Sequence, residues 1–279
     1  MRTGLLGVIG YPVGHSVSPA MMNAALGEAG IHGVLYIAVE VKPRDLKSFV
    51  SSARYMNFIG FNVTIPHKVS VMRFLDRLDK SAKAVESVNV VKLVGERAVG
   101  YNTDVAGVAA SVPEPDEGRA VVLGVGGAAR AAAVALWGKG YDDLVFAGRR
   151  ASSMDEFDRF ARRKNIRIQL VRFGSRELSE AVKEAELLVN ATPVGMFPKT
   201  NQSPIPSNII HRDLTVFDMV YNPVQTKLLK TAKARGAKTI GGLRMLVKQG
   251  SEALKIWLGI EANEKTMEKA ALKALGRRR

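Results

Sequence analysis

Two short segments and a glycine-rich turn carry side chains that together could reduce a ketone. Lys68 closes the segment Asn62-Val63-Thr64-Ile65-Pro66-His67-Lys68, and Asp104 closes Asn102-Thr103-Asp104. The turn, from Gly124 to Arg130, follows downstream. Ketone reduction needs a proton for the oxygen as hydride reaches the carbon, and a lysine ammonium can donate that proton. The arrangement predicts a dehydrogenase in which one module holds the substrate and another holds the hydride carrier.

We expect Lys68 and Asp104 to act as a catalytic pair. The carboxylate can orient the lysine and can hydrogen-bond the same substrate hydroxyl. A carboxylate neighbour also favours the charged form of a lysine, which suits a proton donor better than a free general base. A single lysine or aspartate is usually a solvated surface charge, so this interpretation depends on the surrounding motif.

The glycine-rich turn has the spacing of a dinucleotide fingerprint. Gly124-x-Gly126-x-x-Ala129 follows a predicted strand and opens a predicted helix, which is the context that such a fingerprint needs. Gly124 allows the tight turn, Gly126 lets the backbone approach a pyrophosphate, and Ala129 lets the helix pack on the sheet. The N-terminus of the helix offers free amides to phosphates. The alternative is a glycine-rich turn that binds no ligand.

The strand after the turn indicates which nicotinamide cofactor binds. A site for NAD usually has Asp or Glu at the end of this strand, where the carboxylate bonds a ribose hydroxyl. Here the strand ends in Phe146-Ala147-Gly148-Arg149-Arg150, without a carboxylate. Arginine forms charge-assisted hydrogen bonds with phosphate, so Arg149 and Arg150 predict NADP. The alternative is that both arginines are solvated loop residues.

Two serines near the N-terminus, Ser16 and Ser18, could bind a substrate carboxylate with their hydroxyls. They precede Pro19 at the start of a predicted helix, so both could instead be turn and cap residues, with Ser18 as the N-cap. His15 lies beside them without a carboxylate or a second histidine near it in sequence, and we interpret it as structural.

Composition excludes several classes of protein. The chain has 279 residues, 47% apolar and 24% charged, and no apolar run of the roughly 18 residues that a membrane span requires. With no export signal, the cytoplasm is the expected location. Cysteine is absent, and the histidines His32, His67 and His211 are scattered, which argues against a metal site. The net charge of +15 is spread along the chain, with local groups at Arg159–Lys164 and Arg277–Arg279, and no basic stripe interleaved with aromatic residues predicts nucleic-acid binding.

Apolar strands that alternate with helices predict an α/β fold with a parallel sheet covered on both faces. The expected strands are Leu5–Gly10, Val34–Val39, Ile59–Thr64, Ala120–Leu123, Leu144–Ala147, Ile166–Val171, Leu187–Asn190 and Thr215–Asp218, with a hairpin of Val88–Leu93 and Ala98–Asn102. The expected helices are Pro19–Ala29, Arg44–Ala53, Ala128–Trp137, Ser153–Lys164 and Leu178–Ala185, and helix from about Leu243 onward with Asn263 capping the last one. The segment Val112–Gly118, rich in proline and acidic residues, is the best candidate for a linker.

Several blocks of the chain, in this order, resemble the shikimate dehydrogenase family over nearly its whole length. The blocks are Gly10 to Asn23, Asn62 to Lys68, Val88-Asn89, Asn102 to Asp104, Gly124 to Arg130, Asn190 to Met196, Asp218 to Pro223 and Gly241 to Gly250. The resemblance implies NADPH-dependent reduction of 3-dehydroshikimate to shikimate, a step of aromatic amino-acid biosynthesis. We also expect a monomer or homodimer that binds a small molecule, and neither nucleic acid nor membrane.

The resemblance also implies domains and site residues. Residues 1–104 plus 243–279 would form an α/β substrate-binding and catalytic domain completed by C-terminal helices, and residues 105–242 a Rossmann-like NADP-binding domain. The implied catalytic pair is Lys68 and Asp104. The implied substrate ligands are Ser16, Ser18, Thr64, Asn89, Tyr221 and Gln249. The implied dinucleotide ligands are Gly124, Gly126, Gly127, Ala128, Arg149 and Arg150, with Met219 and Gly242 beside the nicotinamide.

The chain departs from the family pattern at four places. Val90, Val105 and Val125 replace the usual Thr, Gly and Ala, and Gly148-Arg149-Arg150 replaces the usual Asn-Arg-Thr phosphate clamp. The last change leaves NADP binding chemically reasonable and its geometry open. Three alternatives to the implied function remain: a quinate/shikimate dehydrogenase with relaxed specificity, a non-catalytic dinucleotide sensor, and a basic nucleic-acid-binding module.

Overall fold

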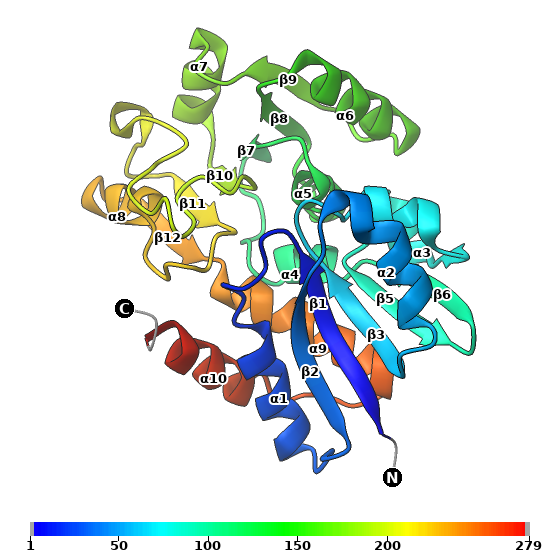
Figure 1. The fold of residues 1–279 in the computed structure, drawn as a ribbon. Coiled ribbons are helices and arrows are strands. Elements are labelled where there is room, and N and C mark those ends of the chain that lie inside the picture. Colours follow the sequence, from blue (N-terminus) through cyan, green and yellow to red (C-terminus); the bar gives the residue numbers. More distant parts are fainter. Residues whose placement is uncertain (1–2, 277–279) are drawn as a thin grey trace. The chain divides into compact units, whose positions relative to one another are not determined.

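The computed structural model describes residues 3–276, and these form two compact units (Figure 1). The first unit contains the residues up to Thr103 and those from Val247 onward, and the second runs from Asp104 to Leu246. The expected division lay after Asp104 and before Leu243. The second boundary falls inside helix α9 (Leu243–Leu258), so this helix starts in one unit and ends in the other.

The first unit is built on a mixed six-stranded sheet with the order β2-β1-β3-β5-β6-β4. Strand β1 is parallel to β2 and β3, whereas β5 is antiparallel to β3 and β6. The strands are β1 (Gly4–Gly10), β2 (Val34–Glu40), β3 (Phe58–Val63), β4 (Arg77–Leu78), β5 (Val90–Val94) and β6 (Arg97–Tyr101). The helices are α1 (Ser18–Glu28), α2 (Leu46–Ala53), α3 (Lys80–Val85), α9 and α10 (Glu264–Gly276), with 3-10 turns η1 (Pro43–Asp45) and η2 (Ser70–Phe74).

Helices cover both faces of this sheet, because its central strands are apolar on both sides. Every residue of β3 is buried. On one face, Leu46 and Val50 of α2 and Ala82 of α3 form a core with Phe61 and Val91. On the other face α1, α9 and α10 pack together so closely that a Cβ added at Gly250 would lie 2.8 Å from the Met21 side chain.

Gly60 of β3 allows a close approach by Trp257 of α9. The indole Nε1 of Trp257 donates to the Val91 carbonyl oxygen at 2.9 Å, and its ring lies 6.2 Å from that of Tyr36. A Cβ on Gly60 would lie 2.3 Å from both Trp257 Nε1 and the Val91 carbonyl oxygen. The glycine therefore lets a large aromatic side chain dock directly on the sheet backbone.

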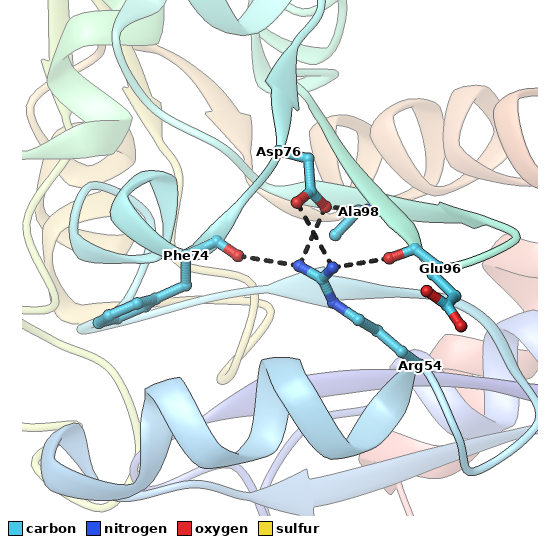
Figure 2. Close-up of polar contacts among 5 residues, drawn as sticks. All are labelled: Arg54, Phe74, Asp76, Glu96 and Ala98. Atoms are coloured by element: carbon cyan, nitrogen blue, oxygen red, sulfur yellow. Dashed lines mark hydrogen bonds and ion pairs between the residues drawn. The ribbon is translucent and has the colours of Figure 1, made fainter.

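Arg54, just after α2, bonds residues of two other segments of the first unit (Figure 2). Its guanidinium donates to the backbone carbonyls of Phe74 and Glu96 and pairs with Asp76 at 3.0 Å. The Asp76 carboxylate also accepts from the Ala98 amide at 2.7 Å, and this hydrogen bond is the first cause of its lowered pKa. One arginine thus joins α2 to the β5–β6 hairpin and to the segment before β4.

The second unit is built on an all-parallel six-stranded sheet with the order β12-β11-β10-β7-β8-β9 (Figure 1). The strands are β7 (Arg119–Leu123), β8 (Asp143–Gly148), β9 (Gln169–Arg172), β10 (Leu187–Asn190), β11 (Thr215–Asp218) and β12 (Lys238–Gly241). The helices are α4 (Asp104–Ala109), α5 (Gly127–Gly138), α6 (Ala151–Arg163), α7 (Arg176–Glu184) and α8 (Lys227–Ala234), with the 3-10 turn η3 (Ser207–Ile209).

Alternate residues of these strands enter two separate cores. In β7, Val122 faces a core with α4, α5 and α6, whereas Val121 and Leu123 face a core with α7 and α8. This is the doubly covered parallel sheet that the alternation of apolar strands and helices predicted. The strand order reverses between β7 and β10, which marks the ligand-binding edge of an open parallel sheet.

Most expected elements are present, and two expectations near the N-terminus and the middle of the chain are wrong. Ser18 is not the N-cap of α1: the cap is Val17, which makes no side-chain cap hydrogen bond, and Ser18 is the first helical residue. Val112–Gly118 is not a linker, because it lies within the second unit. The Glu186 carboxylate accepts hydrogen bonds from three of its backbone amides and holds it in place.

Other elements confirm or extend the expectations. Asn263 caps α10, since its Oδ1 accepts from the amides of Lys265 and Thr266. The strand expected at Ile166–Val171 is shorter, running from Gln169 to Arg172. The sequence did not predict β4, β12, α3, α4 or α8, which are all eight residues or shorter.

Gly60→Ala should destabilise the chain by about 2–4 kcal/mol, because overpacking and a lost indole hydrogen bond both contribute. Urea unfolding measures this loss as a fall in the free energy of unfolding. Gly27→Ala in α1 is the matched control, because an added methyl there meets no atom within 4 Å. Its stability should stay unchanged or rise by about 0.5–1 kcal/mol. Equal stability of the two variants would show that Trp257 does not need the space beside Gly60.

Candidate functional site

The candidate site residues of the first unit meet at one edge of its sheet. Strands β1 and β3 are parallel, so the loops that follow them leave at the same edge. Strand β5 starts there, since Val90 lies opposite Asn62, and β6 ends there, since Tyr101 lies opposite Val90. The side chains carried to this edge are Ser16, Ser18, Thr64, Lys68, Asn89 and Thr103.

Asn89 is the centre of a buried hydrogen-bond network at this edge. Its Nδ2 donates to Thr103 Oγ1 at 2.9 Å and to Gln249 Oε1 at 3.3 Å. Its Oδ1 accepts from the Thr103 amide at 2.8 Å, and the Thr103 hydroxyl donates to the Gln249 carbonyl at 3.0 Å. The network joins the start of β5, the end of β6 and α9, and brings the predicted substrate ligands Asn89 and Gln249 together.

The backbone of Lys68 is held by the same segment. Its carbonyl oxygen accepts from the Val88 amide at 2.8 Å, one residue before Asn89. The Lys68 side chain is half-buried. The preceding residue, His67, is 1% exposed, and its Nε2 lies 2.6 Å from the Val41 carbonyl oxygen, so its ring anchors the loop that carries Lys68.

Asn62 of β3 bonds residues of two other segments and was not among the predicted site residues. Its Oδ1 accepts from the Tyr36 hydroxyl at 2.6 Å, and its Nδ2 donates to the Asn89 carbonyl at 3.0 Å. A buried amide that joins β2 and β3 to the residue before β5 orders the edge where the candidate ligands lie. The signal in the sequence is a polar residue near the end of an otherwise apolar strand.

Ser16 and Ser18 form a pair of hydroxyls after β1. Ser16 Oγ donates to Ser18 Oγ at 3.1 Å and accepts from the Ser18 amide at 3.2 Å. Both serines are buried. Thr64 is half-buried after β3, and its amide donates to the Ile9 carbonyl. The three hydroxyl-bearing residues therefore follow two adjacent parallel strands.

Two further predicted residues belong to the second unit. Asp104 is 3% exposed, begins α4 and directly follows Thr103 of the Asn89 network. Tyr221 is half-buried, three residues after the end of β11.

The predicted dinucleotide ligands lie at the carboxyl edge of the parallel sheet in the second unit. Gly124, Gly126, Gly127 and Ala128 follow β7; Arg149 and Arg150 follow β8; Met219 follows β11; Gly242 follows β12. Because the strands are parallel, these ends share one edge, and that edge includes the point where the strand order reverses. Ligands of open α/β sheets bind at this position.

The glycine turn has the geometry that a bound pyrophosphate needs. Gly124 has φ +117°, a conformation that favours glycine, and its amide donates to the Ala147 carbonyl. A Cβ added at Gly126 would meet no atom within 4 Å, so the turn is open beside the first turn of α5. Ala129 is fully buried against the sheet. The residues present therefore fit a dinucleotide, with free amides at the start of α5 directed at its phosphates.

Arg149 and Arg150 are both exposed at the end of β8. Across residues 3–276, neither guanidinium has an acidic partner within ion-pair distance. Their charges are thus available to a phosphate group.

Asp218, at the end of β11, is a buried carboxylate that sequence reasoning did not assign a role. Its Oδ1 accepts from the Val220 amide at 3.0 Å and from Asn190 Nδ2 at 2.9 Å, and its Oδ2 accepts from the Thr226 hydroxyl at 2.6 Å. Burial raises its pKa to about 6 against the lowering effect of these bonds. Asp218 shapes the loop that carries Met219 and the rest of the Asp218–Pro223 block.

Gly242 lets the chain after β12 touch the chain after β11. A Cβ at this position would lie 2.3 Å from the Met219 carbonyl oxygen. Any larger residue would push apart two of the strand ends that form the carboxyl edge.

No cluster of three or more His, Cys, Asp or Glu side chains that could hold a metal occurs within residues 3–276. No helix in the same range is long and apolar enough to cross a bilayer.

One unit has a Rossmann-type sheet with an open glycine turn, and the other is an α/β unit with a buried polar edge. These features are typical of dinucleotide-dependent oxidoreductases. The profile of the shikimate dehydrogenase substrate-binding domain matches residues 8–91, and that of the shikimate 5′-dehydrogenase C-terminal domain matches residues 242–272. The chain belongs to the shikimate dehydrogenase family.

Individual relatives are similar to this chain over nearly its full length. The NADP-dependent shikimate dehydrogenase of Archaeoglobus fulgidus is 43% identical, with 97% of this chain and 98% of the relative covered. The Thermus thermophilus enzyme, solved with NADP(H) and shikimate, is 34% identical at a TM-score of 0.85, covering 98% of this chain and 100% of that one. A quinate dehydrogenase from Corynebacterium glutamicum, solved with NAD, is 30% identical at a TM-score of 0.86, covering 97% and 99%.

Asp218 should make the stability of the chain depend on pH. Its pKa of about 6 in the folded state lies above the ordinary aspartate value of 3.8, so the folded protein holds the proton more tightly. Stability therefore falls as the pH rises from about 4 to about 6 and stays lower above that. Relative to Asp218→Asn, the wild type should lose roughly 3 kcal/mol over this window, which corresponds to about two pKa units.

Urea unfolding at a series of pH values measures this difference. The control is Asp213→Asn, since the side chain of Asp213 is 80% exposed and the change in net charge is the same. Parallel stability curves for wild type and Asp218→Asn would contradict a buried carboxylate with a raised pKa.

Proposed function

We propose that this chain catalyses the reversible, NADP-dependent interconversion of 3-dehydroshikimate and shikimate. The observation that carries the proposal is the buried Asn89 network, which is tied through Val88 to Lys68 and through Thr103 to Asp104. An ordered polar edge of this kind suits a small substrate with several hydroxyls, because each hydroxyl needs a fixed partner. The family membership of the chain supports the same reaction.

Lys68 is the proton donor in the reducing direction, and Asp104 orients it. NADPH supplies the hydride for the C3 carbonyl carbon when it is bound. The Lys68 ammonium gives a proton to the carbonyl oxygen, and the C=O double bond becomes the C–O single bond of an alcohol. Asp104 accepts a hydrogen bond from the lysine and from the new hydroxyl, which keeps the donor in line with the oxygen. In the oxidising direction the same two residues remove the proton.

The remaining polar residues position the substrate. Ser16 and Ser18 bind its carboxylate with the pair of hydroxyls after β1. Thr64, Asn89, Tyr221 and Gln249 bind its ring hydroxyls. Fixed donors and acceptors of this kind lower the entropy that must be lost in reaching the reactive geometry.

The second unit binds the cofactor along its carboxyl edge. Gly124, Gly126, Gly127 and Ala128 provide backbone amides for the pyrophosphate, and Arg149 and Arg150 bind the 2′-phosphate that distinguishes NADP from NAD. Met219 and Gly242 lie against the nicotinamide end. The chain acts as a monomer or homodimer in the cytoplasm, without a nucleic-acid partner.

A quinate dehydrogenase is the second candidate, because a relative with that activity and with NAD bound has the same fold. The two candidates differ in substrate and cofactor, and absorbance at the NADPH band separates them. We expect kcat/KM to be highest for shikimate with NADP+, and to fall by about 10–100-fold when NAD+ replaces NADP+, the value of a charged hydrogen-bond partner. Preferred turnover of quinate with NAD+ would favour the second candidate. Absence of turnover with either substrate would leave a dinucleotide sensor.

Lys68→Ala should lower turnover by about 10²–10⁴-fold, the usual contribution of a positioned general acid. The KM for shikimate should change little, because the binding hydroxyls and amides remain. Lys47→Ala on α2 is the matched control, since it removes an exposed lysine from the same unit. Near-normal turnover of Lys68→Ala in a folded protein would reject the catalytic role.

A further inference from the structure

A third arginine stands beside Arg149 and Arg150 at the carboxyl edge of the second sheet. Arg172 ends β9, the strand next to β8. The two strands are parallel, with Gly148 opposite Arg172, and the Phe173 amide donates to the Gly148 carbonyl at 3.1 Å. The end of β9 is thereby held directly against the segment where Arg149 begins.

The register sets the side on which Arg172 projects. Phe146 of β8 faces the core under α5 and α6, so Gly148, two residues on, faces the same side. Leu170 lies opposite Phe146 and packs against the same core. Arg172, two residues after Leu170, therefore projects on the side of α6, the helix whose cap is Arg150.

The position between these arginines has no room for a side chain. A Cβ added at Gly148 would lie 2.3 Å from Met154 Cγ and 3.4 Å from Val125 Cγ2. In this chain Met154 fills that space, so a phosphate at the edge must be bound by neighbouring residues instead.

The charges around Gly148 are unbalanced. Arg149, Arg150 and Arg172 are all exposed, and in the part of the chain that the structure describes none of them pairs with a carboxylate. Arg176, four residues after Arg172, differs, because its Nε lies 2.7 Å from Glu180 Oε1. Guanidinium groups gathered at one edge repel each other, and a phosphate monoester with a charge of about −1.5 to −2 would offset that repulsion.

We propose that Arg172 is a specificity-determining residue that binds the 2′-phosphate of NADP together with Arg149 and Arg150. It approaches the phosphate from the end of β9, the strand next to β8. The inference rests on the proposed function only for the identity of the cofactor. It places the recognition of the phosphate on two adjacent strand ends of this chain.

Isothermal titration of the full-length protein tests the proposal without any need for turnover. The probes are NADP+, NAD+ and adenosine 2′,5′-bisphosphate. Arg172→Gln should weaken binding of NADP+ and of the bisphosphate about tenfold, the value of one charge-assisted hydrogen bond, and should leave NAD+ unchanged. Arg172→Lys keeps the charge and should recover part of the affinity. Arg176→Gln, an exposed arginine already paired with Glu180, should bind all three probes like the wild type.

Two results would overturn the inference. In the first, Arg172→Gln binds NADP+ as tightly as the wild type. In the second, it loses NADP+ and NAD+ affinity to the same extent, which would indicate a general structural effect. Either result leaves the proposed function intact if the wild type still reduces NADP+ with shikimate. Conversely, a wild type without that activity removes the proposed reaction, and the ratio of NADP+ to NAD+ affinities still reports on Arg172.

Discussion

The first unit depends on the hydrogen bonds of a single buried amide, that of Asn89. In the Asn89 network, a side chain that is 2% exposed satisfies its donor and acceptor groups on Thr103 and Gln249. Loss of any partner would leave a polar group buried without a hydrogen bond, at a cost of about 1–3 kcal/mol. The network therefore holds β5, β6 and α9 in one arrangement. Since the flanking residues lead directly to Lys68 and Asp104, the same bonds order the backbone that carries the proposed chemistry.

The second unit depends on close contacts between backbones at its carboxyl edge. Gly124 and Gly242 allow chain segments after β7 and β12 to approach carbonyl groups of neighbouring strands, and Asp218 fastens the loop between them. The buried carboxylate is destabilising when charged, as its raised pKa shows. The carboxylate holds three donors, those of Asn190, Val220 and Thr226, in a fixed geometry. An apolar residue in its place would leave these donors without an acceptor and would no longer order the loop after β11. The edge is thus ordered by polar contacts within it, while its outer surface at Gly126 stays open.

The sequence predicted the strands well and the polar contacts poorly, for physical reasons. Central strands such as β7, β10 and β11 are runs of apolar residues between turn signals, and their periodicity follows from burial on both faces. Short elements such as β4 and α3 have too few residues for a pattern. Ser18 was expected to cap α1, yet its hydroxyl bonds Ser16, because cap residues compete with other local partners. The segment Val112–Gly118 looked like a linker, and its distant partners Glu186, Lys139 and Tyr141 explain why it is fixed.

The position of most candidate residues could be read from the sequence because they follow strand ends, whereas the distribution of charge around them could not. Buried Arg130 is neutralised by Glu156 at 2.6 Å and lies over the Phe160 ring, as a guanidinium removed from water must be. The arginines at the ends of β8 and β9 have no such partners among residues 3–276 and remain exposed. A chain with a net charge of +15 has many arginines that need no explanation. Arg149, Arg150 and Arg172 differ, because the sheet register brings them beside Gly148. Glycine has no side chain that could bind a phosphate, so the neighbouring arginines are the available ligands. The pairing of Gly148 with Arg172, 24 positions later, cannot be read from a single sequence, because it depends on the register of the folded sheet.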